Sequence, residues 1–489
     1  AHLQLLAGQV TNQAGGSIGG KTVDASVLGL AQQGGELFSQ GRLTLDLNHG
    51  DLDNRDGLLH GAGPLTLLNL RDVANQRGEI SSTQGFELRA RNLDTRDGKV
   101  LSSQGLTLRI VEQLDAARGL ISARTLNLQA ASLNNRDGVI GSRESAEVQV
   151  SGTFDNQGGA LVTDGALLLR AASVLNTRGQ LAAKGNLQAL VGELDNRSGE
   201  LRSDADLEVL ADGALRNDGG LVASEANLQL RSASLGNDGG RLSSAGDLVV
   251  NSQGALRNQG GVLVADGQIR LASASLDNSQ AGKVSAKGAL LIDTGALDNH
   301  HDGRLASGDR LQLHSGLLDN SAGGRITSSK ALVASVGGLR QQGGELYSAD
   351  SLELDLRYGH LDNRGGLINT PGQLLLKRLA DVDNQGGEIS SASGFDLAAR
   401  NLNNEHGKVL SNQGLSLTLE RALSNLKGQI AAASLHAAAG SLDNAGGVLT
   451  SRGDLRLSIG GLLSNTADGL INAGQVLEAS SARLNNQGG

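Results

Sequence analysis

Apolar residues recur at every second position in short runs along this chain. Gly105–Ile110 and Asp206–Leu210 alternate an apolar with a polar side chain, which is typical of β-strands that bury one face. Glycine is too frequent between the runs for helices, since each glycine in a helix interior costs about 1 kcal/mol. Serine and glycine separate the runs, as in Ser102–Gly105, where we expect turns with positive φ. The pattern predicts an all-β chain.

The apolar runs belong to a short repeat that fills the chain. Its phrase is an apolar residue, any residue, Asn, two or three polar residues, Gly, any residue, and then Leu, Ile or Val, as in Leu52–Leu59. The phrase starts 24 times between Val10 and Leu484, at nearly constant intervals of roughly 20 residues, a period that is typical of solenoids. Two or three short strands per period can form one coil of a parallel β-helix, so we predict a solenoid of about 23 coils.

A longer repeat is superimposed on the short one. Gln32–Ser39 returns in almost the same form as Gln341–Ser348. We interpret residues 30–173 and 339–482 as a duplicated block. We expect residues 1–489 to form a single continuous β-helix, an interior fragment of a longer chain.

Asparagine occupies the third position of the phrase in 20 of the 24 copies, and the exceptions are Gln32, Thr95, Ala116 and Gln341. Stacked coils bring these side chains into a ladder in which each amide donates to the oxygen of the next. Asparagine also tolerates left-handed backbone and bonds to its own turn. We interpret the column as structural, because a ligand-binding role along its whole length would require a polymeric partner.

Composition narrows the possibilities further. The chain has 71 Gly, four Phe, two Tyr, and no Cys, Met or Trp. So few aromatic residues cannot fill several ordinary globular cores, but Leu, Val, Ile and Ala fit a narrow interior in which coils stack about 4.8 Å apart. The net charge of −9 and the lack of a basic face argue against a nucleic-acid partner. The absence of cysteine excludes a disulfide framework and thiolate zinc sites.

One stretch matches a nucleotide-binding motif. Gly15–Thr22 fits the pattern G-x-x-x-x-G-K-[ST] letter for letter. A phosphate-binding loop needs a strand before it and a helix after it, with the helix N-terminus facing the phosphates. Here Gly15 and Gly16 occupy the glycine position of the repeat, and Thr22–Val27 has the pattern of the next strand. We therefore predict no nucleotide site.

The densest group of histidines is His300, His301 and His314. The adjacent coils have Ser279-Gln280 and Ser321-Ala322 where this coil has His300-His301. We interpret these histidines as solvated surface residues.

Aspartate often follows the first apolar residue of the phrase. Asp277, Asp298 and Asp319 would stack in consecutive coils about 5 Å apart, and such a column could take up Ca²⁺. Arginines interrupt it elsewhere, at Arg216, Arg257 and Arg340. We interpret the column as a solvated edge. The short and nearly constant coils also leave no room for the long loops that build a cleft, so we predict no catalytic, cofactor-binding or metal-binding residues, no cofactor and no enzymatic activity.

The phrase Leu-Asp-Asn-x-x-Gly-x-Leu/Ile, followed by a Ser- or Ala-containing turn and Gly-x-Leu-x-Leu, resembles the filamentous haemagglutinin repeats, and Val382–Ile389 is similar to that consensus. The resemblance covers essentially the whole chain. It implies a right-handed parallel β-helix. It also implies a large exoprotein of Gram-negative bacteria, either an adhesin or a contact-dependent growth inhibition toxin, exported by two-partner secretion through an outer-membrane transporter.

From this resemblance we expect a secreted, extracellular shaft at the bacterial cell surface, associated with the outer membrane. It would project an adhesive, receptor-binding or toxin region toward a target-cell surface. In the alternative, the surface of the rod is itself the adhesin and binds glycans or cells. A polysaccharide lyase is a distant third possibility. Unpaired strand edges at the ends of the chain also favour end-to-end self-association.

Overall fold

The computed structural model of the protein describes all residues from 1 to 489. It contains 54 β-strands and no helix, and hence no helix that could cross a membrane. The strands pair in parallel with the equivalent strands of the neighbouring coil, so the predicted parallel β-helix is confirmed. Two compact units, Ala1–Ala245 and Gly246–Gly489, together comprise about 24 turns.

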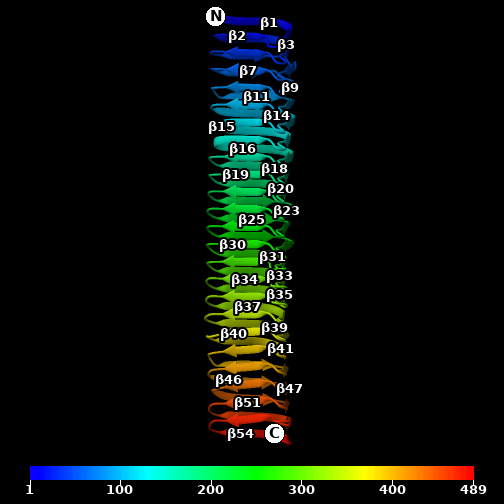
Figure 1. The fold of residues 1–489 in the computed structure, drawn as a ribbon, viewed down its shortest axis with the longest axis vertical. Coiled ribbons are helices and arrows are strands. Elements are labelled where there is room, and N and C mark those ends of the chain that lie inside the picture. The colour runs from blue at the N-terminus through cyan, green and yellow to red at the C-terminus, as the bar shows by residue number, and fades with distance from the viewer. The chain divides into compact units, whose positions relative to one another are not determined.

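The first unit contains the strands β1 to β27, which stack coil upon coil in Figure 1. They are β1 (His2–Thr11), β2 (Ser17–Gly20), β3 (Thr22–Ala31), β4 (Glu36–Ser39), β5 (Leu43–Asp46), β6 (Leu52–Asp53), β7 (Leu58–Gly61), β8 (Leu65–Leu68), β9 (Asp72–Ala74), β10 (Glu79–Ser82), β11 (Phe86–Ala90), β12 (Asn92–Asp94), β13 (Lys99–Ser102), β14 (Gly105–Asp115), β15 (Leu120–Asn134), β16 (Val139–Asp155), β17 (Ala160–Thr163), β18 (Leu167–Leu175), β19 (Gln180–Ala183), β20 (Leu187–Asp195), β21 (Glu200–Ser203), β22 (Leu207–Ala211), β23 (Ala214–Arg216), β24 (Leu221–Ser224), β25 (Leu228–Ser232), β26 (Ser234–Gly236) and β27 (Arg241–Ser244).

The second unit is built in the same way from β28 to β54. Its strands are β28 (Leu248–Ser252), β29 (Ala255–Arg257), β30 (Val262–Ala265), β31 (Ile269–Asp277), β32 (Lys283–Ala286), β33 (Leu290–Asp298), β34 (Arg304–Ser307), β35 (Leu311–Asp319), β36 (Arg325–Ser328), β37 (Leu332–Arg340), β38 (Glu345–Ser348), β39 (Leu352–Asp362), β40 (Leu367–Thr370), β41 (Leu374–Asp383), β42 (Glu388–Ser391), β43 (Phe395–Ala399), β44 (Asn401–Asn403), β45 (Lys408–Ser411), β46 (Gly414–Leu419), β47 (Ala422–Ser424), β48 (Gln429–Ala432), β49 (Ser434–Ala439), β50 (Ser441–Asp443), β51 (Val448–Ser451), β52 (Leu455–Ser464), β53 (Leu470–Ala473) and β54 (Leu477–Asn485).

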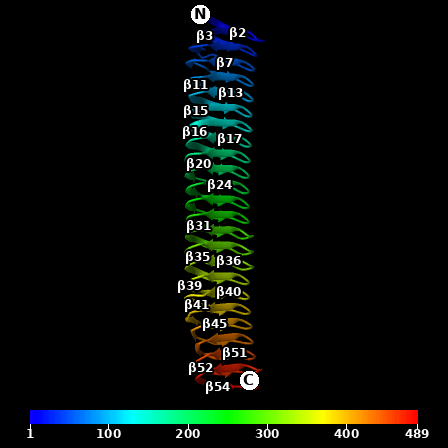
Figure 2. The same ribbon diagram turned by 60° about the vertical axis from the view of Figure 1, so that its left-hand side comes forward.

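Each coil contributes to three columns of strands. In one coil β21 lies in the first column, β22 in the second and β23 in the third, and in other coils a single long strand such as β20 bends from the second column into the third. Figure 2 shows strands of the first column, among them β7, β13, β17 and β24, stacked on one face. We call the turn from the third column to the first, such as residues 196–199, the asparagine corner. The turn from the first column to the second, such as residues 203–206, is the serine corner.

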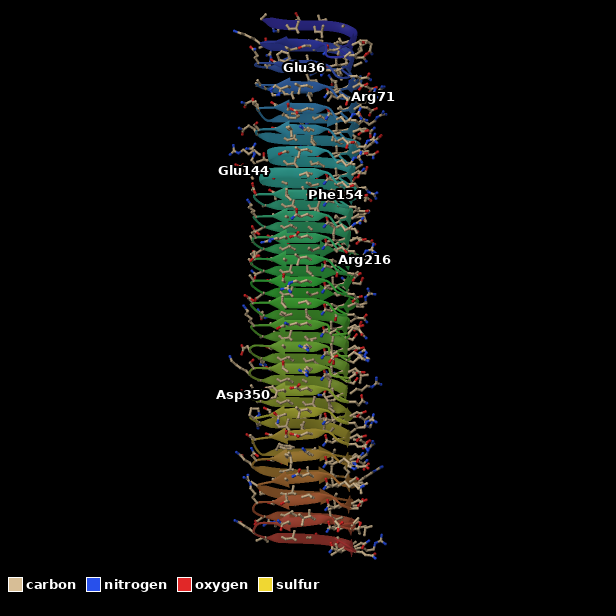
Figure 3. All side chains as sticks on the ribbon, in the orientation of Figure 1. Glu36, Arg71, Glu144, Phe154, Arg216 and Asp350 are labelled. Atoms are coloured by element: carbon tan, nitrogen blue, oxygen red, sulfur yellow. The ribbon has the colours of Figure 1, made fainter.

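The interior consists of aliphatic side chains stacked in register. In the first column Leu161 pairs with Leu181, Leu181 with Leu201, and Leu201 with Val222, and all four are fully buried. The residues between them point outward, as the period of two predicts. Figure 3 shows the outward side chains, with Glu144 projecting from the first unit.

Three of the four phenylalanines are buried, although a narrow interior disfavours aromatic rings. Phe154 is the largest fully buried side chain and lies in register between Leu133 and Val174. Its coil has Ala146 in the second column where the neighbouring coils have larger leucines, so the larger ring and the smaller alanine keep the volume of the coil nearly constant.

Replacement of Phe154 by Ala removes this ring from a filled interior. We expect Phe154→Ala to lower the free energy of unfolding by about 3–5 kcal/mol, the usual cost of a buried aromatic cavity. Urea denaturation followed by circular dichroism measures the loss. Phe38→Ala is the matched control, because Phe38 is only half-buried and lies against Gly19. An equal loss in both variants would contradict a filled interior at Phe154.

Candidate functional site

The asparagine side chains form the predicted ladder. The Nδ2 atom of Asn196 donates to Oδ1 of Asn217 in the next coil at 2.7 Å, and it also lies 3.1 Å from the Leu221 carbonyl oxygen and 3.3 Å from the Gly199 carbonyl oxygen. Oδ1 of Asn196 accepts from Asn176 at 2.7 Å. Both asparagines flanking Asn196 are, like it, fully buried. The Asn196 amide is thus satisfied by the wall of the solenoid itself.

Fifteen such rungs have an Nδ2–Oδ1 distance of 2.7 or 2.8 Å. They join Asn54–Asn75, Asn135–Asn156, Asn156–Asn176, Asn176–Asn196, Asn196–Asn217 and Asn217–Asn237 in the first unit, and Asn258–Asn278, Asn278–Asn299, Asn299–Asn320, Asn363–Asn384, Asn384–Asn404, Asn404–Asn425, Asn425–Asn444, Asn444–Asn465 and Asn465–Asn486 in the second.

The four exceptions to asparagine affect the ladder differently. Gln32 continues it, since its Nε2 donates to Asn54 at 2.9 Å, and Thr95 accepts from Asn75 at 3.0 Å. Gln341 instead donates to the Leu367 carbonyl, and Oδ1 of the next residue in the column, Asn363, has no partner. Ala116 has no amide, and Oδ1 of the following Asn135 is likewise unpaired.

The glycine of the phrase is required by a close approach between coils. A Cβ atom at Gly199 would lie 2.1 Å from the Asn176 carbonyl oxygen of the preceding coil, and Gly199 does not have a positive φ. The left-handed residue of the corner is the one before it, Ser198, with φ of 54°. Asp56 and Arg77 have the same conformation in other coils. This glycine is therefore needed because it lacks a side chain.

The serine corner corrects the expectation of positive φ at Ser102–Gly105, since none of these residues has it. The Ser102 hydroxyl organises the turn instead. Its Oγ accepts from the Gln104 N–H at 3.2 Å and lies 3.1 Å from the Gly105 carbonyl oxygen. It also lies 2.9 Å from the Gln84 carbonyl oxygen of the preceding coil. The hydroxyl thus fixes the turn and joins two coils.

The aspartate column stacks as predicted. Asp277 pairs with Asp298, and Asp298 with Asp319. Arginine interrupts the column as expected, because Asp195 pairs with Arg216 and Asp319 with Arg340.

These carboxylates are half-buried turn caps, which differs from the solvated edge expected from the sequence. The backbone N–H two residues later donates to each of Asp277, Asp298 and Asp319 at 3.1 Å. No group of three or more His, Asp or Glu side chains in the structure is arranged to hold a metal ion.

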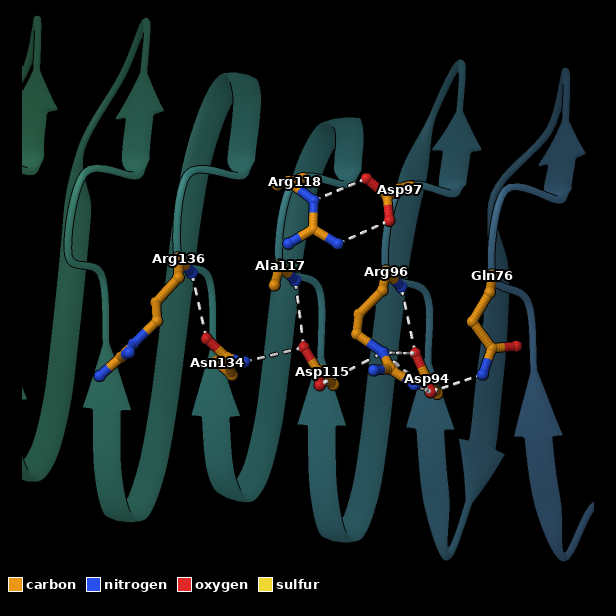
Figure 4. A network of polar contacts seen from close by, with 9 residues as sticks. All are labelled: Gln76, Asp94, Arg96, Asp97, Asp115, Ala117, Arg118, Asn134 and Arg136. Atoms are coloured by element: carbon orange, nitrogen blue, oxygen red, sulfur yellow. Dashed lines mark hydrogen bonds and ion pairs between the residues drawn. The ribbon is translucent and has the colours of Figure 1, made fainter.

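Figure 4 shows how such caps join neighbouring coils. Asp94 accepts from the Arg96 N–H at 3.2 Å, from the Arg96 guanidinium at 2.6 Å and from Gln76 of the preceding coil at 2.6 Å. In the next coil Asp115 accepts from Asn134 at 2.9 Å.

A second row of charges follows the outer edge of the asparagine corner. Arg118 binds Asp97 through two hydrogen bonds of 2.8 Å, and Arg77 binds Asp56 through two of 2.7 Å. Opposite charges therefore face each other along the stack, which avoids repulsion between equivalent positions.

The histidine group does not converge on one site. The His300 and His301 rings lie 4.2 Å apart at the asparagine corner, and His300 bonds to Asp298. His314 lies in the second column and bonds to Arg357 at 3.0 Å. His301 and His314 are exposed, as predicted, whereas His300 is half-buried.

The motif Gly15–Thr22 has no phosphate-binding geometry. Ser17–Gly20 forms the strand β2, and Thr22 begins the strand β3. Lys21 lies at the corner between them, where its carbonyl oxygen accepts from Ser39 Oγ at 3.0 Å. A strand therefore stands where a nucleotide-binding loop would have its helix.

An interior ladder of amides repeated in nearly all coils is the mark of a parallel β-helix built from short, equivalent repeats. The haemagglutinin repeat model matches residues 5–71, 39–113, 111–158, 145–251, 258–315, 294–418 and 396–488. The chain belongs to the haemagglutinin repeat family. No curated protein and no solved structure matches it.

Removal of one amide tests the ladder. Asn196→Ala removes the nearest acceptor of Asn176 Nδ2 and leaves Asn217 Oδ1 without its donor. We expect the free energy of unfolding to fall by roughly 2–4 kcal/mol, because buried polar groups are left unpaired. Urea denaturation measures the change, and Asn186→Ala at an exposed position is the control. Similar effects of the two substitutions would refute a stabilising role of the ladder.

The ion pairs predict acid lability. Hydrogen bonds from Arg400, together with Asn401, lower the pKa of Asp381 to about 2. A folded pKa below the ordinary 3.8 means that this carboxylate stabilises the fold above about pH 4, and that the contribution is lost as pH falls toward 2. We expect melting temperature to fall over this range, and Asp381→Asn to reduce the decline. Asp396→Asn, at an exposed position, should leave the decline unchanged, and a decline unaffected by Asp381→Asn would contradict the assignment.

Proposed function

We propose that the protein is the structural shaft of a large secreted exoprotein, which holds an adhesive, receptor-binding or toxin region away from the producing cell. The observation that supports this is the equivalence of the coils. Each repeats the same interior column and strand pairing at intervals of roughly 20 residues, and nearly all share the amide rung. Stability of such a stack is a sum over neighbouring coils, so length can change without a change of fold.

Membership of the haemagglutinin repeat family supports two-partner secretion as the route by which the protein reaches the cell surface. In the proposal, the exoprotein passes through an outer-membrane two-partner-secretion transporter of a Gram-negative bacterium and remains at the cell surface. Regions outside these residues contact the target cell.

We also propose that the two units form one continuous β-helix and that residues 30–173 and 339–482 are a duplicated block. The repeat keeps its ordinary interval where the units meet, from Asn237 to Asn258. A rod with about 23 intervals of 4.8 Å would be about 110 Å long. Small-angle scattering from dilute protein measures this length, and a much shorter maximum dimension would refute continuity.

Deletion of one complete coil tests the shaft. Residues 176–195 can be removed so that Leu175 precedes Asn196, because Leu175 and Asp195 are equivalent in register. In the full-length exoprotein we expect surface display to persist, while target-cell contact by the distal region declines only through shorter reach. Deletion of residues 176–185 is the control, since it breaks the register and should disrupt the folding of the coils around it. Loss of display after the whole-coil deletion would contradict the shaft.

One surface supports the alternative in which the rod itself is the adhesin. Tyr358 is 74% exposed and has a left-handed backbone, with φ of 65°. The preceding Arg357 donates to the Ser335 carbonyl at 2.6 Å and bonds to His314. His314 also lines a shallow depression of about 490 Å³ with Arg270, Asp293 and other side chains. An exposed aromatic ring beside fixed polar groups suits a hydroxyl-rich ligand such as a glycan.

Tyr358→Ala in the full-length exoprotein distinguishes this alternative from the shaft. Glycan-array binding that falls at unchanged display, with Tyr347→Ala as the half-buried control, would make the rod the binder. Cleavage of a sugar polymer by the purified chain would favour the polysaccharide lyase over both. End-to-end association remains a further proposal, tested by light scattering over a range of concentrations.

A further inference from the structure

One coil of the first unit lacks both the buried amide at the asparagine corner and the hydroxyl at the serine corner. Residues 114–132 carry Ala116 at the asparagine corner, and we call them the unlatched coil. On the N-terminal side, the Thr95 hydroxyl accepts a hydrogen bond from Asn75, but Ala116 has no polar side chain that could bond to Thr95. On the C-terminal side, Oδ1 of Asn135 has no hydrogen-bond partner. This coil therefore has no amide rung on either face.

The serine corner of the same coil is also without its hydroxyl. Ala123 lies in register with Ser142 and occupies the position that Ser102 holds in the preceding coil. Ser102 Oγ reaches back to the Gln84 carbonyl of the coil before it, and Ala123 cannot make the equivalent contact with the Ser102 coil. Ser142 bonds instead to Thr163, on its far side. Both corner contacts are thus replaced by alanine in one coil.

The strand pairing around the unlatched coil is irregular as well. The pairing of β14 with β15 shifts register between Ile110 and Gln113. The pairing of β15 with β16 shifts twice, between Ala123 and Thr125 and between Ala130 and Leu133. Each shift interrupts the regular hydrogen bonding between the paired strands.

The coil is still held by its backbone pairing, its core and ion pairs at its surface. Ile121 and Leu128 are fully buried, and Asn134 donates to Asp115 at 2.9 Å. Arg118 binds Asp97 of the preceding coil at 2.8 Å, and Arg124 pairs with Glu144 at 2.6 Å. These two ion pairs are about half exposed, and exposed ion pairs contribute little. The loss of buried corner bonds is therefore uncompensated.

We propose that the unlatched coil is a built-in opening point, at which the first unit parts while the coils on both sides remain folded. In a solenoid the stability is distributed over the interfaces between neighbours, and local opening begins where the free energy of an interface is lowest. The separation exposes the backbone of residues 114–137, whereas the uninterrupted rungs from Asn135 to Asn237 hold the following coils together.

The second unit contains a matched coil. Asn425 stands at the position equivalent to Ala116 in the second copy of the long repeat and makes rungs of 2.7 Å on both sides, with Asn404 and with Asn444. The equivalent of Ala123 there is Ala432, which is also alanine. The two coils thus differ in the amide while sharing the alanine at the serine corner.

Hydrogen–deuterium exchange of the whole chain tests the proposal. The N–H groups of Ala116 and Arg118 bond to the next coil, as do those of Asn425 and Lys427. We expect the first pair to exchange about tenfold faster after correction for intrinsic rates, because a buried amide hydrogen bond changes an opening equilibrium by about that factor. Ala116→Asn should slow exchange in the first coil, and Asn425→Ala should accelerate it in the second.

Equal exchange of the two coils in the unmodified chain would overturn the proposal. So would an Ala116→Asn variant that keeps the wild-type circular dichroism spectrum but does not slow exchange at residues 114–137. If that variant does not fold, the Asn425→Ala variant is the deciding test. Exchange at residues 423–446 that stays at the wild-type rate in Asn425→Ala would also overturn the proposal. Asn412→Ala, which changes an exposed asparagine, is the control for unspecific effects.

Discussion

A buried asparagine amide must find every hydrogen bond inside the protein, and this requirement governs the structure of the coils. Its N–H groups need two acceptors and its oxygen needs a donor, since unpaired polar groups are costly where water is absent. Equivalent amides in successive coils meet the need if they lie one coil apart, as the 2.7 Å rungs show. Strand pairing sets the coil spacing, while the turn that presents the amide and the glycine that lets the next coil approach allow the amides to meet at that spacing.

The sequence was sufficient to predict the fold because its signal is repeated. The alternation in Gly105–Ile110 predicted strands, the constant interval predicted coils, and the asparagine column predicted the ladder. The resemblance to filamentous haemagglutinin repeats agreed with the family that matches the chain. Each of these inferences used the spacing of residue types along the chain, which stays constant even where individual residues differ between copies of the repeat.

The roles of the corner residues could not be predicted in the same way, because they depend on distances between coils. The sequence showed only that the phrase contains a glycine, yet at Gly199 the carbonyl oxygen of Asn176 leaves no room for a side chain. Ser102 was expected in a turn with positive φ, yet its φ is not positive and its hydroxyl joins two coils. Asp277 looked like a solvated charge, yet it caps the turn that follows. Residues of the adjacent coil, one full period away in the sequence, determine the first two roles, and the local turn determines the third.

The ladder has a direction, since each amide donates toward the C-terminus and accepts from the N-terminal side. The column is consequently a line of parallel dipoles, in which each bond polarises the next and strengthens it. Such cooperativity increases with the number of uninterrupted members, so a rung in the middle of a long column is held more firmly than one at its end. Ala116 divides the column of the first unit into a short segment from Asn12 to Thr95 and a longer one from Asn135 to Asn237. The free energy of the interface between two neighbouring coils thus depends partly on amides that neither coil contacts.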